Sequence, residues 1–193
     1  MTARTHDLAA ITALALVAVM QPIPVLTLST VLLALLANQI GGIAPDIDQP
    51  TAPLRRNLPI GHIFGKLFDL LSGGHRFLSH SLIGVVLFGL LAHLLLGALQ
   101  PLMPHVDTQI VLLAFMIGVL SHLVMDTFTK EGVPWLLPIP VKFGIPPIKK
   151  FRVTTGHWAE HLLVIPLLLL CDVALIASRY DQLLAYIHHQ LIR

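Results

Sequence analysis

The chain has 193 residues, of which 55% are hydrophobic and only 11% are Asp, Glu, Lys or Arg, and its mean hydropathy is +0.83. Soluble domains carry roughly 25% charged residues, so this composition excludes an ordinary soluble domain and indicates an integral membrane protein. The formal net charge of only +2 gives no support to a nucleic-acid partner. The single cysteine excludes an intrachain disulfide and a cysteine-based zinc site.

Five apolar segments follow one another along the chain. They cover residues 8–21, 25–44, 82–100, 108–126 and 161–178. A helix that crosses the hydrocarbon core of a bilayer needs about 20 residues, and most of these segments approach or reach that length. The first segment is the shortest and lacks a clear small-x-small cleavage site, so we interpret it as a retained helix. We therefore expect one all-α domain over residues 1–193, built as a polytopic membrane helical bundle.

Two long connections separate these segments. Within residues 45–81, apolar residues at helical spacing predict a short amphipathic helix that lies on the membrane surface or packs on the bundle. These residues are Ile60, Ile63, Phe64, Leu67, Phe68 and Leu71. Residues 127–157 are rich in prolines and bases, which predicts a basic loop that contains a short hairpin. We expect residues 181–193 to form a short amphipathic helix.

Lys and Arg are distributed unequally between the two sides of this bundle. If all five segments cross the membrane, ten of the twelve Lys and Arg residues share the side of the N-terminus. Only Arg179 and Arg193 fall on the other side. The positive-inside rule therefore places the N-terminus in the cytoplasm.

Candidate metal ligands gather on that same side, although they come from five separate parts of the chain. They are His6, Asp46, Asp48, His75, His80, His122, Asp126, His157 and Glu160. His122 and Asp126 are four residues apart and share one face of a helix, and His157 and Glu160 are three residues apart. The two carboxylates of the sequence PDID point the same way if that stretch is extended. Imidazole and carboxylate together suit Zn²⁺ and also accommodate Mn²⁺ or Fe, and this many ligands can hold one to three ions.

Each of these patterns also has a structural explanation. An Asp that follows a helix commonly forms a turn, and a His four residues before an Asp is frequent by chance. His93 fits a histidine satisfied within the bundle, and Asp172 fits an interfacial or packing residue. The metal interpretation therefore depends on the convergence of the clusters at one face.

The order of these motifs resembles the YdjM-like family of bacterial inner-membrane proteins, which are described as metal-dependent hydrolases. The motifs are His6, GGIAPDIDQP, GGHRFLSHS, SHLVMDTFTKEGVPWLLP and TTGHWAE, and the resemblance runs from residue 5 to residue 161. It implies a multi-pass protein of the inner membrane and functional roles for His6, Asp46, Asp48, His75, Arg76, His80, His122, Asp126 and Glu160. Gln49 departs from the family pattern, which often has His or a similar polar residue there.

A more distant likeness, to zinc-dependent phospholipase C, rests on clustered His, Asp and Glu ligands. His122 and Asp126 match one of its ligand pairs. Its second pair is matched imperfectly, because His161 stands where that pattern has Glu.

Together these features predict a membrane-bound metal-dependent hydrolase that acts on a phospholipid or another lipid-linked phosphoester at the cytoplasmic face. In this hypothesis a metal-activated water attacks the ester, Asp48 or Glu160 acts as general base, and Arg76 clamps the phosphate. The alternative is a divalent-cation transporter or a metal-binding membrane protein without hydrolytic activity. A transporter favours ionisable residues near the bilayer midplane, whereas these candidates lie at one end. The sequence leaves the substrate, the metal and the oligomeric state open.

Overall fold

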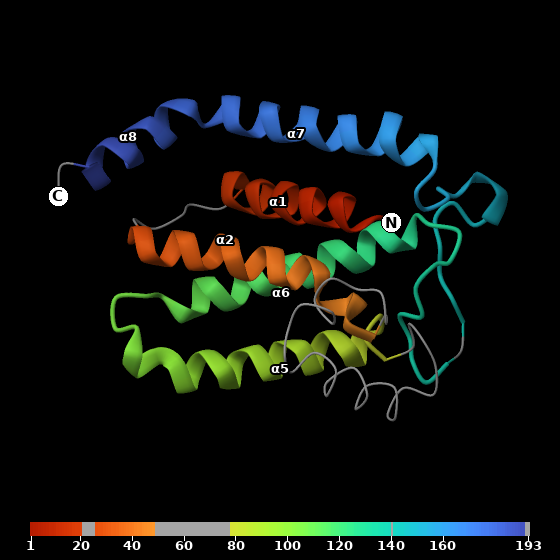
Figure 1. The fold of residues 1–193 in the computed structure, drawn as a ribbon, viewed down its shortest axis with the longest axis horizontal. Helices are drawn as coiled ribbons and strands as arrows, with labels where there is room; N and C mark the ends of the chain where they lie inside the picture. Colours follow the sequence, from red (N-terminus) through yellow and green to blue (C-terminus); the bar gives the residue numbers. More distant parts are fainter. Residues whose placement is uncertain (21–25, 49–77, 140, 192–193) are drawn as a thin grey trace.

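The computed structural model of the chain is all-helical (Figure 1) and describes residues 1–20, 26–48, 78–139 and 141–191. Five of its helical spans are long and apolar enough to cross a membrane, which confirms the predicted fold class. Their α-helices are α1 (Ala3–Met20), α2 (Leu28–Ile43), α5 (Leu82–Leu99), α6 (Thr108–Thr127) and α7 (Ile165–Ser178). Within the described residues, extended pairing is limited to two isolated bridges.

Polar side chains fix the first turns of three of these helices. Thr27, Ser81 and Asp107 accept hydrogen bonds from backbone amides at the starts of α2, α5 and α6. These bonds satisfy donors that the first turn of a helix leaves unpaired. The last span begins differently, because the π-helix η4 (Glu160–Val164) precedes α7 and Pro166 supplies no amide hydrogen.

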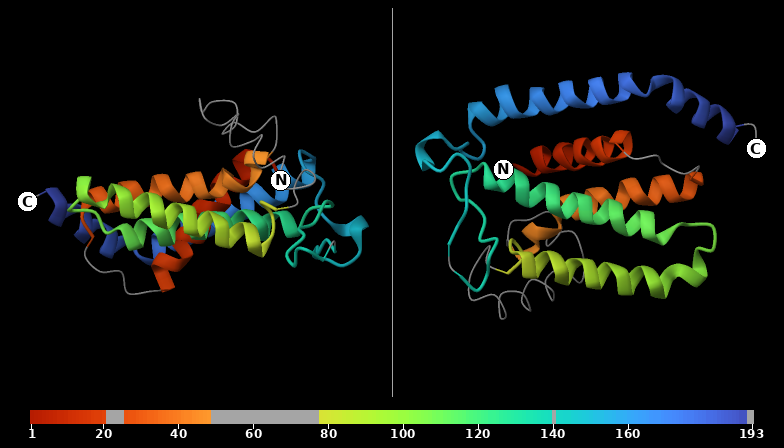
Figure 2. Two further views of the ribbon diagram at one scale, coloured as in Figure 1. Left: turned by 90° about the horizontal axis from the view of Figure 1, so that it is seen from below. Right: turned by 180° about the vertical axis from the view of Figure 1, so that it is seen from behind.

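The helices run up and down beside one another (Figures 1 and 2). The pair α2 and α6 forms the centre, α1 packs against both of them and against α7, and α5 packs against α6. The start of α1, the ends of α2 and α6, and the starts of α5 and α7 therefore lie at one end of the bundle, near the N-terminus. The ends of α1, α5 and α7 lie at the other end.

Glycines allow α2 and α6 to approach closely. A Cβ added to Gly118 would collide with the carbonyl oxygen of Asn38 and the amide nitrogen of Gly42. A Cβ on Gly41 would likewise collide with the carbonyl oxygen of Phe115. Small residues at such crossings favour helix association in membranes. The Asn38 side chain adds a hydrogen bond of 3.1 Å from Nδ2 to the carbonyl oxygen of Ala114 on α6.

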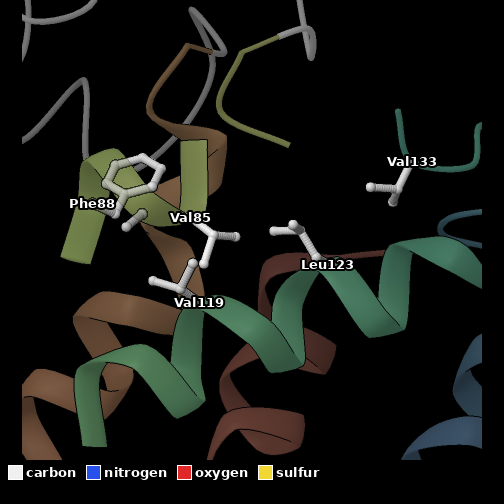
Figure 3. Close-up of a cluster of buried hydrophobic side chains, with 6 residues drawn as sticks. Val85, Phe88, Val119, Leu123 and Val133 are labelled. Carbon is white, nitrogen blue, oxygen red and sulfur yellow. The ribbon is translucent and has the colours of Figure 1, made fainter. Parts of the chain in front are cut away.

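A small apolar cluster supports the end of α6 (Figure 3). Val85 and Phe88 of α5 pack with Val119 and Leu123 of α6, and Val133 approaches from the loop that follows. By contrast, α7 has no buried residue, and many of its apolar side chains, such as Leu167, Leu170 and Val173, are exposed. The tightly packed part of the molecule is thus the region around α6.

Several element boundaries differ from the sequence predictions. Helix α1 begins at Ala3 and not near residue 8, because Thr5 and His6 are buried by packing even though they are polar. The predicted helix in the tail is present as α8 (Tyr180–Leu191). In the basic loop, Val133 and Phe143 exchange two backbone hydrogen bonds of 2.8 and 2.9 Å, as a short hairpin requires. The amphipathic helix predicted for residues 60–71 lies outside the described residues.

Candidate metal centre

Five of the predicted ligand residues come together at the end of the bundle. His6 lies in the second turn of α1, His80 lies in the turn before α5, and His122 and Asp126 lie on the last turns of α6. Asp46 lies in η1 (Ala44–Asp48), the 3₁₀ turn that ends α2. The first four side chains are at most 1% exposed, whereas Asp46 is 19% exposed. Ionisable groups buried this deeply require partners.

Four atoms of this group form a compact set. His80 Nε2 lies 3.6 Å from Asp46 Oδ1 and 3.6 Å from Asp126 Oδ2. His122 Nε2 lies 3.7 and 3.8 Å from the same two oxygens. Ligands held about 2.1 Å from a tetrahedral zinc ion are separated from one another by roughly 3.4 Å. The observed separations are slightly larger, and the ligand atoms of Asp46, His80 and His122 all lie within 4.8 Å of one another, as do those of His6, His122 and Asp126, so each group is close enough to hold a divalent cation after a small contraction.

The tautomer of His122 directs a lone pair at this set, and His80 can do the same when its Nδ1 donates to Ser79. His122 Nδ1 lies 2.6 Å from the carbonyl oxygen of Gly42, and because a carbonyl only accepts, Nδ1 must carry the hydrogen. Nε2 therefore holds the lone pair. His80 Nδ1 is paired with the hydroxyl of Ser79 at 2.9 Å. Within the described part of the chain, neither Nε2 has a hydrogen-bond partner. Metal-binding histidines are typically oriented in this way through the second ring nitrogen, so the residues fit a metal ion.

His6 has a different relationship to the set. Its ring stacks on that of His122, with the centroids 3.7 Å apart and the planes inclined by 11°. Its Nε2 lies 3.3 Å from Asp126 Oδ1, whereas the contacts of His80 and His122 are to Oδ2 of the same carboxylate. The amino nitrogen of Met1 also contacts this oxygen.

Glu160 has a full set of protein partners and belongs to neither of the His and Asp clusters among the described residues. Its Oε1 accepts hydrogen bonds from the amide and hydroxyl of Thr2 and from the hydroxyl of Thr5. Its Oε2 accepts one from the amide of Gly156 at 2.7 Å. This carboxylate therefore joins the start of α1 to the start of η4. Glu160 thus lies outside the two His and Asp groups of the described residues, and its role as metal ligand or general base stays a prediction.

His157 also lies apart from the set, because its side chain is exposed. The sequence prediction assumed that His157 and Glu160 share one α-helical face. In the structure Gly156 has a φ of 74°, His157 precedes the helix that begins at Trp158, and this helix passes into the π-helix η4 at Glu160, so His157 and Glu160 do not lie within one regular α-helix. The PDID stretch is likewise a 3₁₀ turn and not extended. The Asp48 side chain, His75 and Arg76 lie outside the described residues.

Sequence reasoning missed three groups that organise the site. Thr2 and Thr5 bind Glu160, and the carbonyl oxygen of Gly42 fixes His122. A backbone acceptor leaves no trace in residue identity.

An all-helical bundle with five candidate spans and a buried histidine and aspartate cluster at one end defines a polytopic membrane protein with a candidate metal centre. The sequence model of the family described as YdjM inner membrane protein matches residues 1–186, and the chain belongs to this family. The resemblance seen in the motifs is thereby confirmed. Family membership and the apolar spans together indicate a multi-pass inner membrane protein.

Individual relatives agree with this placement. The chain is 27% identical over 129 residues to the uncharacterized protein YvsG of Bacillus subtilis, which covers 66% of this chain and 69% of that protein. It is 34% identical over 109 residues to the inner membrane protein YdjM of Escherichia coli, which covers 54% of this chain and 48% of that protein. The YdjM protein of Shigella flexneri gives the same values. The chain thus spans about half the length of these two YdjM proteins. No solved structure matches the chain.

Proposed function

We propose that this protein is a membrane-bound metal-dependent hydrolase that acts on a lipid-linked phosphoester at the cytoplasmic face of the membrane. The observation that supports the proposal is the convergence of His80 Nε2, His122 Nε2, Asp46 Oδ1 and Asp126 Oδ2 from three separate parts of the fold. Two imidazoles with free Nε2 atoms beside two carboxylates form a ligand set suited to zinc.

Each residue has a distinct role in this proposal. Asp46, His80, His122 and Asp126 hold the divalent cation, for which zinc is the first choice and Mn²⁺ or Fe the alternative. Such a cation lowers the pKa of water and stabilises developing negative charge on an ester. Asp46 is the most exposed of the four, so substrate approaches from its side. Asp48 remains our candidate for the general base, and Arg76 for binding the phosphate.

A basic and apolar surface at the same end of the bundle supports a lipid substrate. The short helix η3 (Lys149–Phe151) exposes Lys149 and Lys150 next to Ile148 and Phe151, which are 60% and 69% exposed. Lysines mixed with exposed apolar side chains are typical of a surface that contacts anionic headgroups. Arg152 holds this segment in place through bonds from Nε and Nη2 to the carbonyl oxygens of Pro146 and Pro147.

The test is hydrolysis by purified protein in nanodiscs that contain anionic phospholipid. The zinc-loaded protein should cleave a bis(p-nitrophenyl) phosphate ester or a fluorescent phospholipid, and His80→Ala and Asp126→Ala should each lose at least about 100-fold in rate. His93→Ala is a matched control, because His93 is exposed on α5 and far from the set along that helix. The proposed site is wrong if His80→Ala and Asp126→Ala keep full metal content and turnover.

A transport assay tests the alternative function. Proteoliposomes loaded with a zinc-sensitive dye should show no zinc flux above that of empty vesicles. Flux without hydrolysis of either ester would favour the transporter, and the proposal of a hydrolase would then be abandoned.

A further inference from the structure

We infer that the described residues of this centre hold a single metal ion, and that His6 positions Asp126 without binding the ion. The inference rests on the metal-binding part of the proposed function. It goes beyond that proposal in the number of ions and in the role of His6, which the sequence motifs had suggested as a ligand.

The number of ions is limited by the ligand that the two possible groups share. Two overlapping groups of described residues have ligand atoms close enough for an ion: His6 with His122 and Asp126, and Asp46 with His80 and His122. Both groups include His122. An imidazole bridges two ions only through both of its nitrogens, and His122 Nδ1 already donates to Gly42. Its single lone pair on Nε2 can therefore serve only one of the two groups.

The orientations of the imidazole rings indicate which of the two ligand groups binds the ion. The lone pair of an imidazole nitrogen lies in the plane of the ring, and the rings of His6 and His122 are nearly parallel and stacked at 3.7 Å. An ion in the plane of one ring therefore lies above the face of the other, where no lone pair points. His80 has no such conflict, because its ring is inclined to that of His122 by 70°. The geometry thus favours Asp46, His80 and His122, and Asp126 completes the set through Oδ2.

His6 contacts one oxygen of Asp126, and the other two imidazoles contact the second. Asp126 has one oxygen toward each side: Oδ2 faces His80 and His122, and Oδ1 lies 3.3 Å from His6 Nε2. The Met1 amino group donates a hydrogen bond to Oδ1, and His6 Nε2, which has no hydrogen-bond partner among the described residues, adds a close polar contact to the same oxygen. Together they restrict the rotation of the carboxylate and so keep Oδ2 directed at the ion. Residues that orient metal ligands in this way typically contribute 10–100-fold to affinity.

The experiment measures metal binding and needs no catalytic activity. Untagged protein in detergent is loaded with Zn²⁺, its metal content is measured by mass spectrometry, and its affinity is measured by competition with a chromophoric chelator. We expect one zinc per chain in the wild type and in His6→Ala, with the affinity of His6→Ala weakened about 10–100-fold. His6→Gln should recover part of this loss because it retains a donor. His122→Ala should lose tight binding, and His157→Ala, which alters an exposed histidine, should match the wild type.

X-ray absorption at the zinc edge provides the decisive count. The wild-type spectrum should contain two imidazoles per zinc, and the spectrum of His6→Ala should be the same. Two ions per chain, a third imidazole in the wild type, or the loss of an imidazole in His6→Ala would each overturn the inference while leaving the metal site intact. A wild-type protein that binds no divalent metal would overturn the proposed function itself. The wild-type count decides the question even if His6→Ala does not fold.

Discussion

His122 on α6 donates its Nδ1 hydrogen to the carbonyl oxygen of Gly42 on α2 over 2.6 Å, across 80 positions of the sequence. The same two helices are in close contact at Gly41 and Gly118. The orientation of a candidate metal ligand is thus tied to the crossing of the two central helices. A substitution that separates these helices should therefore affect stability and metal affinity together.

Gly118→Ala tests this coupling. Its new Cβ would collide with backbone atoms of Asn38 and Gly42, so we expect a loss of about 1–3 kcal/mol in stability and weaker zinc binding. Thermal unfolding in detergent and a chelator titration measure the two effects. Gly97→Ala is the matched control, because a Cβ there meets nothing within 4 Å, and it should be neutral or stabilise by up to about 1 kcal/mol. Equal stability and affinity in Gly118→Ala and the wild type would refute the coupling.

Replacement of Glu160 should reduce stability and leave metal content unchanged. Glu160→Ala removes the acceptor of four hydrogen bonds from Thr2, Thr5 and Gly156, and buried donors without partners cost about 1–3 kcal/mol each. Thermal unfolding and metal analysis of the same sample separate the two properties. Glu131→Ala removes an exposed carboxylate and should change neither. If Glu160→Ala loses its metal but unfolds at the wild-type temperature, Glu160 is a ligand after all.

The orientation in the membrane is tested by cysteine labelling in a Cys171→Ser background. Lys149→Cys lies at the end of the bundle that carries the candidate site, and Gln182→Cys lies on α8 near the other end. Because most of the basic residues share the first end, the positive-inside rule predicts that Lys149→Cys reacts with an impermeant maleimide only in inverted vesicles. Gln182→Cys should react in intact spheroplasts. The reverse pattern would place the site outside the cytoplasm.

The basic loop should lie in the lipid headgroup region. Trp158 is 67% exposed, and exposed tryptophans near helix ends are typical of the membrane interface. In a Trp135→Phe variant in nanodiscs, lipids brominated near the headgroup should quench Trp158 fluorescence more than lipids brominated at the chain end. Replacing Lys149 and Lys150 by Gln should weaken quenching in anionic lipid, since each lysine contributes about 1 kcal/mol. Strong quenching by aqueous iodide with no effect of bromine would contradict this placement.

The sequence predicted the helical spans well because lipid cannot satisfy backbone hydrogen bonds, so each span is a long apolar run. The prediction of the first span was wrong at the start of α1, which begins at Ala3 and not near residue 8. His6 lies in a polar stretch, and it is helical and buried because α6 packs on it. Hydropathy measures transfer to lipid and does not register polar side chains that are buried against other side chains.

The site was predicted in part for a similar reason. The order of the spans brings Asp46, His80, His122 and Asp126 to one end of the bundle, and this follows from connectivity alone. The roles of the side chains depend on details that residue spacing does not contain. The π-helix at Glu160 changes which residues share a face, and the stacking of the His6 ring on that of His122 is a contact that residue spacing does not predict.

The acceptor that orients His122 is a main-chain oxygen, and this has a consequence for mutational tolerance. No substitution at position 42 removes a carbonyl group, so a side-chain change cannot delete this hydrogen bond directly. It is sensitive only to displacement of the backbone, which Gly41 and Gly118 control. Inactivating substitutions should therefore fall on these small, chemically inert residues as often as on the ligands themselves, and a screen for lost function should recover both groups.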